Sequence, residues 1–431
     1  MITRTILCCM CALMSCPVGA EEVSLARAVE LAVEHAPAMK AAEAGRDMAD
    51  QEAAIGYAGL MPRLDATGTY QLRNQKTTYD QPRNLFLTNQ KYRDSTVGLR
   101  LVQPLFDLER WAGYRQGALS AETGEMKLRL EHQRLMLETA QTYLEAVTAR
   151  AALLSARAKE AAAESLAEQA QATFKAGVMT FNEGLDADAR RDLAQAERLA
   201  AENDLDQARD RLASLTGNME IGVFPPSIAG DLAVPASTEP ESWERRAAEQ
   251  AISVRLARLQ FRTAEQEELK AVGSNLPKVE AFASLQGNRA TSGQLGTGTR
   301  TRDQAVGLQV SMPLFAGGGD VARVKMSKKA ALQADYLLQD DIRLARLTAR
   351  QAYRGYAAAI SQMHAMRKAV ASAKEAADAA RMGHEVGLRT LTDVLDADGR
   401  RFEAEKNLAG AEAQFVFAEL QLKSSVGTLD S

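Results

Sequence analysis

The chain has 431 residues, of which 46% are hydrophobic and 25% are charged, and its formal net charge is −4. This charge excludes a general nucleic-acid binder and a polybasic membrane anchor. Aromatic residues make up only 5% of the chain. Alanine-rich, charged segments of this kind favour long helices packed side by side over one globular core.

Residues 1–20 have the features of a cleaved export signal. Arg4 provides a positive charge, and the apolar stretch after it is too short to span a bilayer. The small residues at 18–20 predict cleavage before Glu21; a buried N-terminal helix and lipoprotein processing at Cys16 are the alternatives. All four cysteines lie in this segment, so we expect an exported mature chain without disulfides.

After the signal, the chain reads as two copies of one unit, 21–216 and 239–431, joined by a linker at 217–238. Pro-Leu-Phe at 104–106 recurs at 313–315, and Leu-Asp-Ala-Asp at 185–188 recurs at 395–398. Each copy has the order helix, strand, loop, strand, long helix, turn, helix.

The expected elements follow this order in both copies. The first copy has a helix at about 24–60, strands at about 63–75 and 94–105, a long helix at 107–174, a tip turn at 175–181 and a helix at 182–216. The second has a helix at about 239–275, strands at about 278–288 and 303–314, a long helix at 317–384, a tip turn at 385–390 and a helix at 391–426. Each long helix would measure about 100 Å, which equals two shorter helices stacked end to end. These lengths predict a cylindrical wall of helices.

The strands alternate apolar and polar residues, as in Leu64, Ala66, Tyr70 and Leu72 against Asp65, Thr67, Thr69 and Gln71. Such alternation over about ten residues is typical of membrane-barrel strands, and a soluble half-buried sheet is the alternative. No segment after the signal is long and apolar enough to be a transmembrane helix, so membrane contact would require a closed barrel. Four strands cannot close one, which predicts an oligomer. Two copies would give about eight strands and three about twelve; a hollow wall favours three.

Local sequence signals define the turns. Pro104 and Pro313 lack a backbone N–H, and we expect each to end its strand. Gly177 and Gly387 can take the left-handed conformation that ends a helix. Capping of the helix that follows is expected from Thr180 and Thr390, or from Asn182 and Thr392. The acidic residues after these caps, Glu183, Asp186, Asp393 and Asp396, are explained most simply as stabilisers of the positive helix end.

The segment 385–397, the tail 422–429 and the paired Pro-Leu-Phe strand ends resemble the TolC family of outer-membrane efflux and type I secretion ducts. The resemblance covers the mature chain. It implies a mainly α-helical homotrimer in which each chain contributes four strands to a shared twelve-stranded barrel. The barrel would continue into a long periplasmic α-helical barrel of coiled-coil hairpins.

The resemblance also implies a function and partners. The protein would be a channel-tunnel in the outer membrane of a Gram-negative cell, in contact with outer-membrane lipid. It would export drugs, small toxic molecules or proteins in a tripartite efflux pump or a type I secretion system. Its partners would be a periplasmic adaptor (membrane fusion) protein and an inner-membrane transporter of the ABC, RND or MFS class. The tip turns with Gly177, Thr180, Gly387 and Thr390 would contact the adaptor.

The family resemblance assigns a closing latch to the tips. Arg389 in the second turn would bond to Asn182 and Glu183 at the start of the helix after the first turn. His384 stands where the family has an aromatic hydroxyl, which is a departure from the pattern. We hypothesise a contact between His384 and Glu183 that strengthens when His384 is protonated.

The resemblance further implies an acidic constriction. Asp393 and Asp396 would project into the lumen, where threefold symmetry makes each a ring of like charge that attracts cations. Asp186 adds an acidic group in the first copy, and its orientation toward the lumen stays open.

Other classes of function fit less well. The histidines, His35, His132, His364 and His384, are scattered and form no catalytic or metal-ligating motif, so we expect no enzyme, cofactor or metal. A periplasmic adaptor is the main rival, but it would carry one hairpin and lipoyl-like domains. A purely structural coiled coil would not need the strands.

Overall fold

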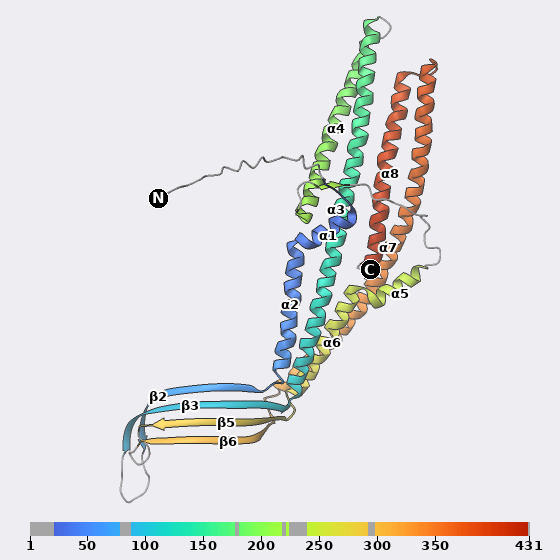
Figure 1. Ribbon diagram of the computed structural model, residues 1–431. Coiled ribbons are helices and arrows are strands. Elements are labelled where there is room, and N and C mark those ends of the chain that lie inside the picture. Colours follow the sequence, from blue (N-terminus) through green and yellow to red (C-terminus); the bar gives the residue numbers. More distant parts are fainter. Residues whose placement is uncertain are drawn as a thin grey trace, which may run out of the picture. The chain divides into compact units, whose positions relative to one another are not determined.

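The computed structural model describes residues 21–77, 88–176, 181–217, 221–223, 239–291 and 298–429. The elements, in chain order, are β1 (Glu21–Val23), α1 (Leu25–His35), α2 (Pro37–Ala58), β2 (Arg63–Thr77), β3 (Thr88–Phe106), α3 (Leu108–Lys175), α4 (Phe181–Thr216), β4 (Ile221–Val223), α5 (Pro240–Gln250), α6 (Ile252–Gly273), β5 (Lys278–Ala290), β6 (Thr299–Ser311), α7 (Gly319–Glu385) and α8 (Leu391–Ser425) (Figure 1). Two compact units share them. One comprises the described residues within Met1–Lys40, Glu131–Glu244 and Thr348–Ser431, and the other those within Ala41–Leu130 and Arg245–Leu347.

The second unit carries a four-stranded antiparallel sheet in the order β2-β3-β5-β6 (Figure 1). Its register pairs Leu64 with Leu101 and Ala66 with Leu99, so apolar residues of neighbouring strands share one face. The side chains of this face are open to solvent: Leu64 is 66% exposed and Val306 87%. The alternation seen in the sequence therefore produces an apolar sheet face that the chain itself leaves uncovered.

The expectation that both prolines end their strands is wrong for Pro104. Strand β3 continues to Phe106, with Pro104 paired to Glu280 and a shift of register between Pro104 and Phe106. A bulge of this kind accommodates a residue that cannot donate to the ladder. In the second copy, β6 ends at Ser311, before Pro313.

Phe282 interrupts the alternation because its bulky ring lies on the polar face. The register places it opposite Gly307, and a side chain at Gly307 would come within 3.1 Å of the Phe282 ring. The guanidinium of Arg100 lies 5.7 Å from the centre of the same ring. The ring thus covers a glycine and stacks with a cation, which accounts for an aromatic residue among polar ones.

The helices predicted as unbroken at 24–60 and 239–275 are each divided in two. The first breaks at Ala36, before Pro37, and the second at Ala251, before Ile252. Pro37 disfavours a helical conformation at the residue before it, which explains the first break. No proline marks the second, where Ala251 has the non-helical backbone angles φ −53° and ψ 135°. The break is therefore a property of the repeated unit.

The first unit contains two helical hairpins, α3 from Glu131 onward with α4, and α7 from Thr348 onward with α8 (Figure 1). Alanine and a few larger residues fill the contacts, as in the cluster of Ala359, Ile360, Met363, Ala411, Phe415 and Ala418 between α7 and α8. Small side chains let the helices approach closely and bury little apolar area per contact.

A short parallel pairing of β1 with β4 was not anticipated from the sequence. The hydroxyl of buried Tyr143 on α3 donates to the carbonyl of Val23 at 2.7 Å, which ties β1 to α3. Within the described ranges, every helix is too short or too polar to be a membrane-crossing segment.

Candidate functional site

The turn between α7 and α8 is built around Gly387. This residue has a φ of +76°, a left-handed conformation that favours glycine. The N–H of Gly387 donates to the carbonyl of His384 at 2.9 Å, and the N–H of Leu388 donates to that of Gly383 at 2.8 Å. These bonds satisfy carbonyls at the end of α7, as the glycine at this position led us to expect.

Thr390 caps the next helix, and Asp393 completes the cap. The N–H of Asp393 donates to the Thr390 hydroxyl oxygen at 3.2 Å, while the Thr390 N–H and hydroxyl donate to the Asp393 carboxylate at 2.9 and 2.8 Å. Donation from Thr390 holds the pKa of Asp393 below its usual value, and the charge of Arg389 adds to the effect. The Asp393 carboxylate thus accepts hydrogen bonds at the N-terminus of its own helix, α8.

Arg389 and His384 are joined within the same turn. One ring nitrogen of His384, Nδ1, lies 3.0 Å from the carbonyl oxygen of Arg389. The aliphatic part of the Arg389 side chain packs against Gly383. A Cβ added at Gly383 would lie only 2.7 Å from the Cγ of Arg389. His384 therefore holds the backbone of the arginine, and Gly383 leaves room for its stem.

Part of the predicted latch lies outside the described residues. Asn182 and Glu183 belong to α4, but their side chains are not among those described, and Gly177 and Thr180 fall in a gap of the described ranges. The contacts predicted from Arg389 to Asn182 and Glu183, and from His384 to Glu183, therefore stay predictions.

Asp186 and Asp396 are linked through an arginine that the sequence reasoning did not single out as functional. The Nε of Arg190 donates to Asp186 at 3.0 Å, and its Nη1 lies 3.5 Å from the Asp396 carboxylate. Asp186 and Arg190 are four residues apart on α4, a spacing that favours an ion pair and could have been read from the sequence. The ion pair with Asp396 on α8 joins the two hairpins, and this contact could not have been predicted from the sequence.

Another acidic residue near the tip, Asp398, is also held by arginine. Arg381 on α7 donates to it at 2.5 Å, and the Arg401 Nε lies 3.7 Å away. Asp398 is only 7% exposed. It ties α7 to α8 inside one hairpin.

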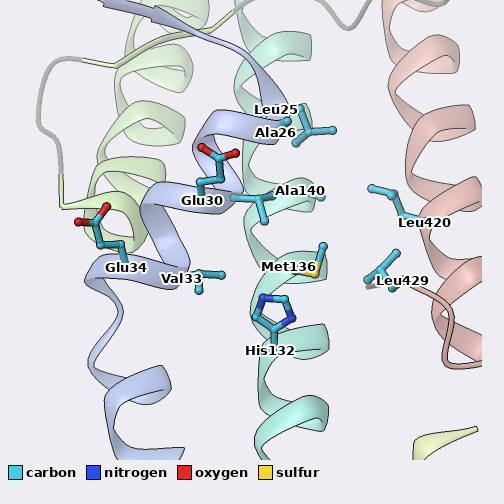
Figure 2. A pocket seen from close by; sticks show the side chains of 11 residues that line it. Leu25, Ala26, Glu30, Val33, Glu34, His132, Met136, Ala140, Leu420 and Leu429 are labelled. Carbon is cyan, nitrogen blue, oxygen red and sulfur yellow. The ribbon is translucent and has the colours of Figure 1, made fainter. Parts of the chain in front are cut away.

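An open apolar pocket of about 600 Å³ lies elsewhere in the first unit, beside α1, α3 and α8. Figure 2 shows His132, Met136 and Ala140 along α3, with Leu420 and Leu429 on one side and Val33 of α1 on the other. In the described part of the chain, no group of three or more metal-ligating side chains occurs here or elsewhere. The pocket shares no residue with the tip.

Comparison with known proteins identifies the family. The family model described as outer membrane efflux protein matches residues 28–218 and 243–428, which correspond closely to the two copies. The outer membrane protein TolC of Vibrio cholerae is 28% identical over 412 residues, covering 94% of this chain and 91% of that protein. The proteases secretion protein PrtF of Dickeya chrysanthemi is 28% identical over 417 residues, covering 96% of this chain and 90% of that protein.

A solved structure shares the fold. The outer membrane protein VceC of Vibrio cholerae matches with a TM-score of 0.76 at 18% identity, over 94% of this chain and 96% of that one. The repeated unit, the four strands and the two long hairpins are thus those of TolC-like channels. The chain belongs to the outer membrane efflux protein family, as a TolC-like efflux and secretion channel protein.

Proposed function

We propose that three copies of this chain assemble into one channel-tunnel, with a shared twelve-stranded barrel in the outer membrane and a helical tunnel in the periplasm. The observation that carries this proposal is the open sheet. Among the described residues, β2 and β6 have no partner strand on their outer edges. Long unpaired edges invite pairing with another chain, and lipid tolerates none.

The exposed apolar face of the sheet supports the same arrangement, because it suits lipid and would be unfavourable in water. Four strands from each of three chains give a barrel of about twelve strands, wide enough for a lumen. Residues 1–20 would direct export and be removed.

The cargo would be drugs, small toxic molecules or proteins, passed on by an inner-membrane transporter through a periplasmic adaptor. Protein cargo is supported by PrtF, which is named for the secretion of proteases, and efflux by the name of the family model. Adaptor contact is assigned to the two tip turns, where Gly387 and Thr390 shape the connection between α7 and α8.

The gate is proposed at these tips. Arg389 would hold Asn182 and Glu183 of the first hairpin, with Asp393 and Asp396 forming the acidic constriction. His384 would add a pH-dependent contact to Glu183. Single-channel conductance of wild type and His384→Phe, compared at about pH 5.5 and 8, tests this contact. Identical pH responses of the two proteins would rule it out.

One preparation tests the assembly. The full chain is purified from detergent-solubilised outer membrane, analysed for heat-resistant trimers and added to planar bilayers. We expect trimers that form pores. Monomers without pore activity would instead favour the adaptor class and contradict the proposal.

A further inference from the structure

A cluster of arginines lies on the apolar face of the sheet, at the end remote from the helices of its unit. The register pairs Leu72 with Arg93, Ser95 with Arg289, Arg289 with Arg300 and Gly287 with Arg302. Directly paired residues of antiparallel strands project from the same face, and so do residues two apart along one strand. The four arginines therefore share the face of the apolar residues.

The apolar residues continue on this face toward the helices. On β5 the order from Arg289 is Gly287, Leu285, Ala283, Ala281 and Val279. The ten residue-to-residue steps from Arg289 to Val279 measure about 33 Å along the strand, or about 25 Å in height at a tilt of about 40°. This is about the height of the apolar band on outer-membrane barrels. The arginines would therefore lie at one border of the hydrocarbon layer.

The arginines on the two faces of the sheet differ in whether they form ion pairs. On the polar face, Arg63 lies 2.9 Å from Asp65, and Arg73 lies 3.7 Å from Asp94. On the apolar face, the side chains of Arg93, Arg289, Arg300 and Arg302 are exposed and, within the described ranges, form no ion pair. The described strands place Lys91 on this face as well, and no aspartate or glutamate.

A hollow of about 340 Å³ lies beside the cluster. Its lining includes Val97, Leu99, Leu285 and Gly287 of the apolar face, together with Arg302 and its neighbour Asp303. Because Gly287 has no side chain, the surface is recessed next to the guanidinium group of Arg302. Gly98, Gln286 and Gln304 complete the lining, and Asp303 and Gln286 belong to the polar face. The apolar residues of the hollow offer contacts to an acyl chain, and Arg302 beside them suits an anionic headgroup.

We propose that Arg93, Arg289, Arg300 and Arg302 bind the phosphate groups of a phosphorylated glycolipid in the outward-facing leaflet of the outer membrane. Guanidinium groups form paired, charge-assisted hydrogen bonds with phosphate oxygens and have no competing carboxylate on this face. The inference rests on the proposed function, which sets the apolar face against lipid and the helices in the periplasm.

The test uses the purified full chain in detergent, titrated with a diphosphorylated glycolipid, with its dephosphorylated form and with inorganic phosphate. The reported quantity is the thermal unfolding midpoint, which a ligand of the folded state raises. We expect the phosphorylated glycolipid alone to raise it. The apparent affinity should fall by roughly fivefold for each arginine removed, and a variant with all four arginines replaced by glutamine should lose the response.

Arg73→Gln with Arg100→Gln on the polar face is the matched control and should respond as wild type does. Equal responses of the fourfold variant and wild type would overturn the inference, as would equal responses to the two glycolipids or to inorganic phosphate. Pore formation in planar bilayers, measured on the same preparations, separates this result from the proposed function. Wild-type pores without a response to lipid phosphate overturn the lipid inference alone, whereas a wild type without pores overturns the channel proposal.

Discussion

Arg190 on α4 lies 3.5 Å from Asp396 on α8 and 3.0 Å from Asp186 on its own helix. One guanidinium thus stands between two carboxylates that belong to different hairpins. Both pairs are largely exposed, so each contributes little to stability. Their effect on function comes instead from position, because the arginine offsets the charge of a residue assigned to the constriction.

Replacing Arg190 with glutamine should therefore increase the preference of the channel for cations. An exposed pair contributes about 0.5 kcal/mol, so the permeability ratio should change by roughly twofold. The ratio is measured from the reversal potential under a salt gradient. In an Asp396→Asn background the same replacement should have a smaller effect. There Arg190 pairs with the Asp186 carboxylate alone, so its loss exposes one negative charge instead of two.

Arg191→Gln is the control, because Arg191 pairs with Asp188 and Asp192 of its own helix. An equal effect of Arg190→Gln with and without Asp396 would show that the two residues do not act on each other in the channel.

The sequence was most informative where a local rule decides the structure. Left-handed glycine at Gly387, the Thr390 cap and the strand alternation each depend on a few neighbouring residues. The repeat strengthened these predictions, since a signal that occurs twice at a fixed spacing is unlikely to be accidental. Proline was less reliable: Pro104 was expected to end a strand, and a bulge carries the strand past it.

Contacts between distant segments could not be read in this way. The Arg190–Asp396 pair joins residues more than two hundred positions apart, and the pairing of β1 with β4 spans a similar distance. Many arginines and carboxylates on these helices could form pairs, and only the packing selects among them. The same holds for the arginine cluster, which appears only when the register of three strands is known.

The capping role of Asp393 changes how the acidic constriction should be tested. Alanine at both Asp393 and Asp396 would remove both ring charges and would also weaken the start of α8. Asp396→Asn alone leaves the cap in place. It should reduce block of the open channel by a trivalent cation, because a ring of like charge binds such an ion.

Block is measured as the concentration that halves the single-channel current. Asp393→Asn keeps a hydrogen-bond acceptor at the cap, and combined with Asp396→Asn it should remove most of the block. Block that persists unchanged in the double variant would show that these two rings do not line the constriction.

The cap itself should be sensitive to acid. Since the folded state lowers the pKa of Asp393, its contribution to tip stability is present above the pKa of the unfolded chain, about 3.9. That contribution is lost as the pH falls through the lower, folded-state pKa. Amide hydrogen exchange of the first turn of α8, corrected for the intrinsic rate, should therefore rise below about pH 4.

In Asp393→Asn this acid-induced rise should disappear, since the amide does not titrate. Thr390→Ala should accelerate exchange at all pH values, because loss of an N-cap hydroxyl costs about 1 kcal/mol. Thr392→Ala, at an exposed neighbouring position, is the control. A pH profile of Asp393→Asn that matches wild type would assign the acid sensitivity to another group.

Gly383 offers a way to disturb the proposed latch without touching its charged groups. A Cβ at this position would lie 2.7 Å from the Cγ of Arg389, so Gly383→Ala must displace the stem of the arginine. If Arg389 closes the tip, the variant should show a higher open probability in planar bilayers. Gly355→Ala on the same helix is the matched control, because a Cβ there meets nothing within 4 Å.

The order of effects distinguishes a latch from a general loss of helix packing. Arg389→Ala should open the channel at least as much as Gly383→Ala, and the two changes together should add nothing further, because both act through one side chain. Additive opening would mean that Gly383 acts through the packing of α7 and not through Arg389. An unchanged open probability in Arg389→Ala would remove this residue from the gate. The candidates for closing the tip would then be other described contacts between the hairpins, such as the Arg190–Asp396 pair and the packing of Leu395 on the first hairpin.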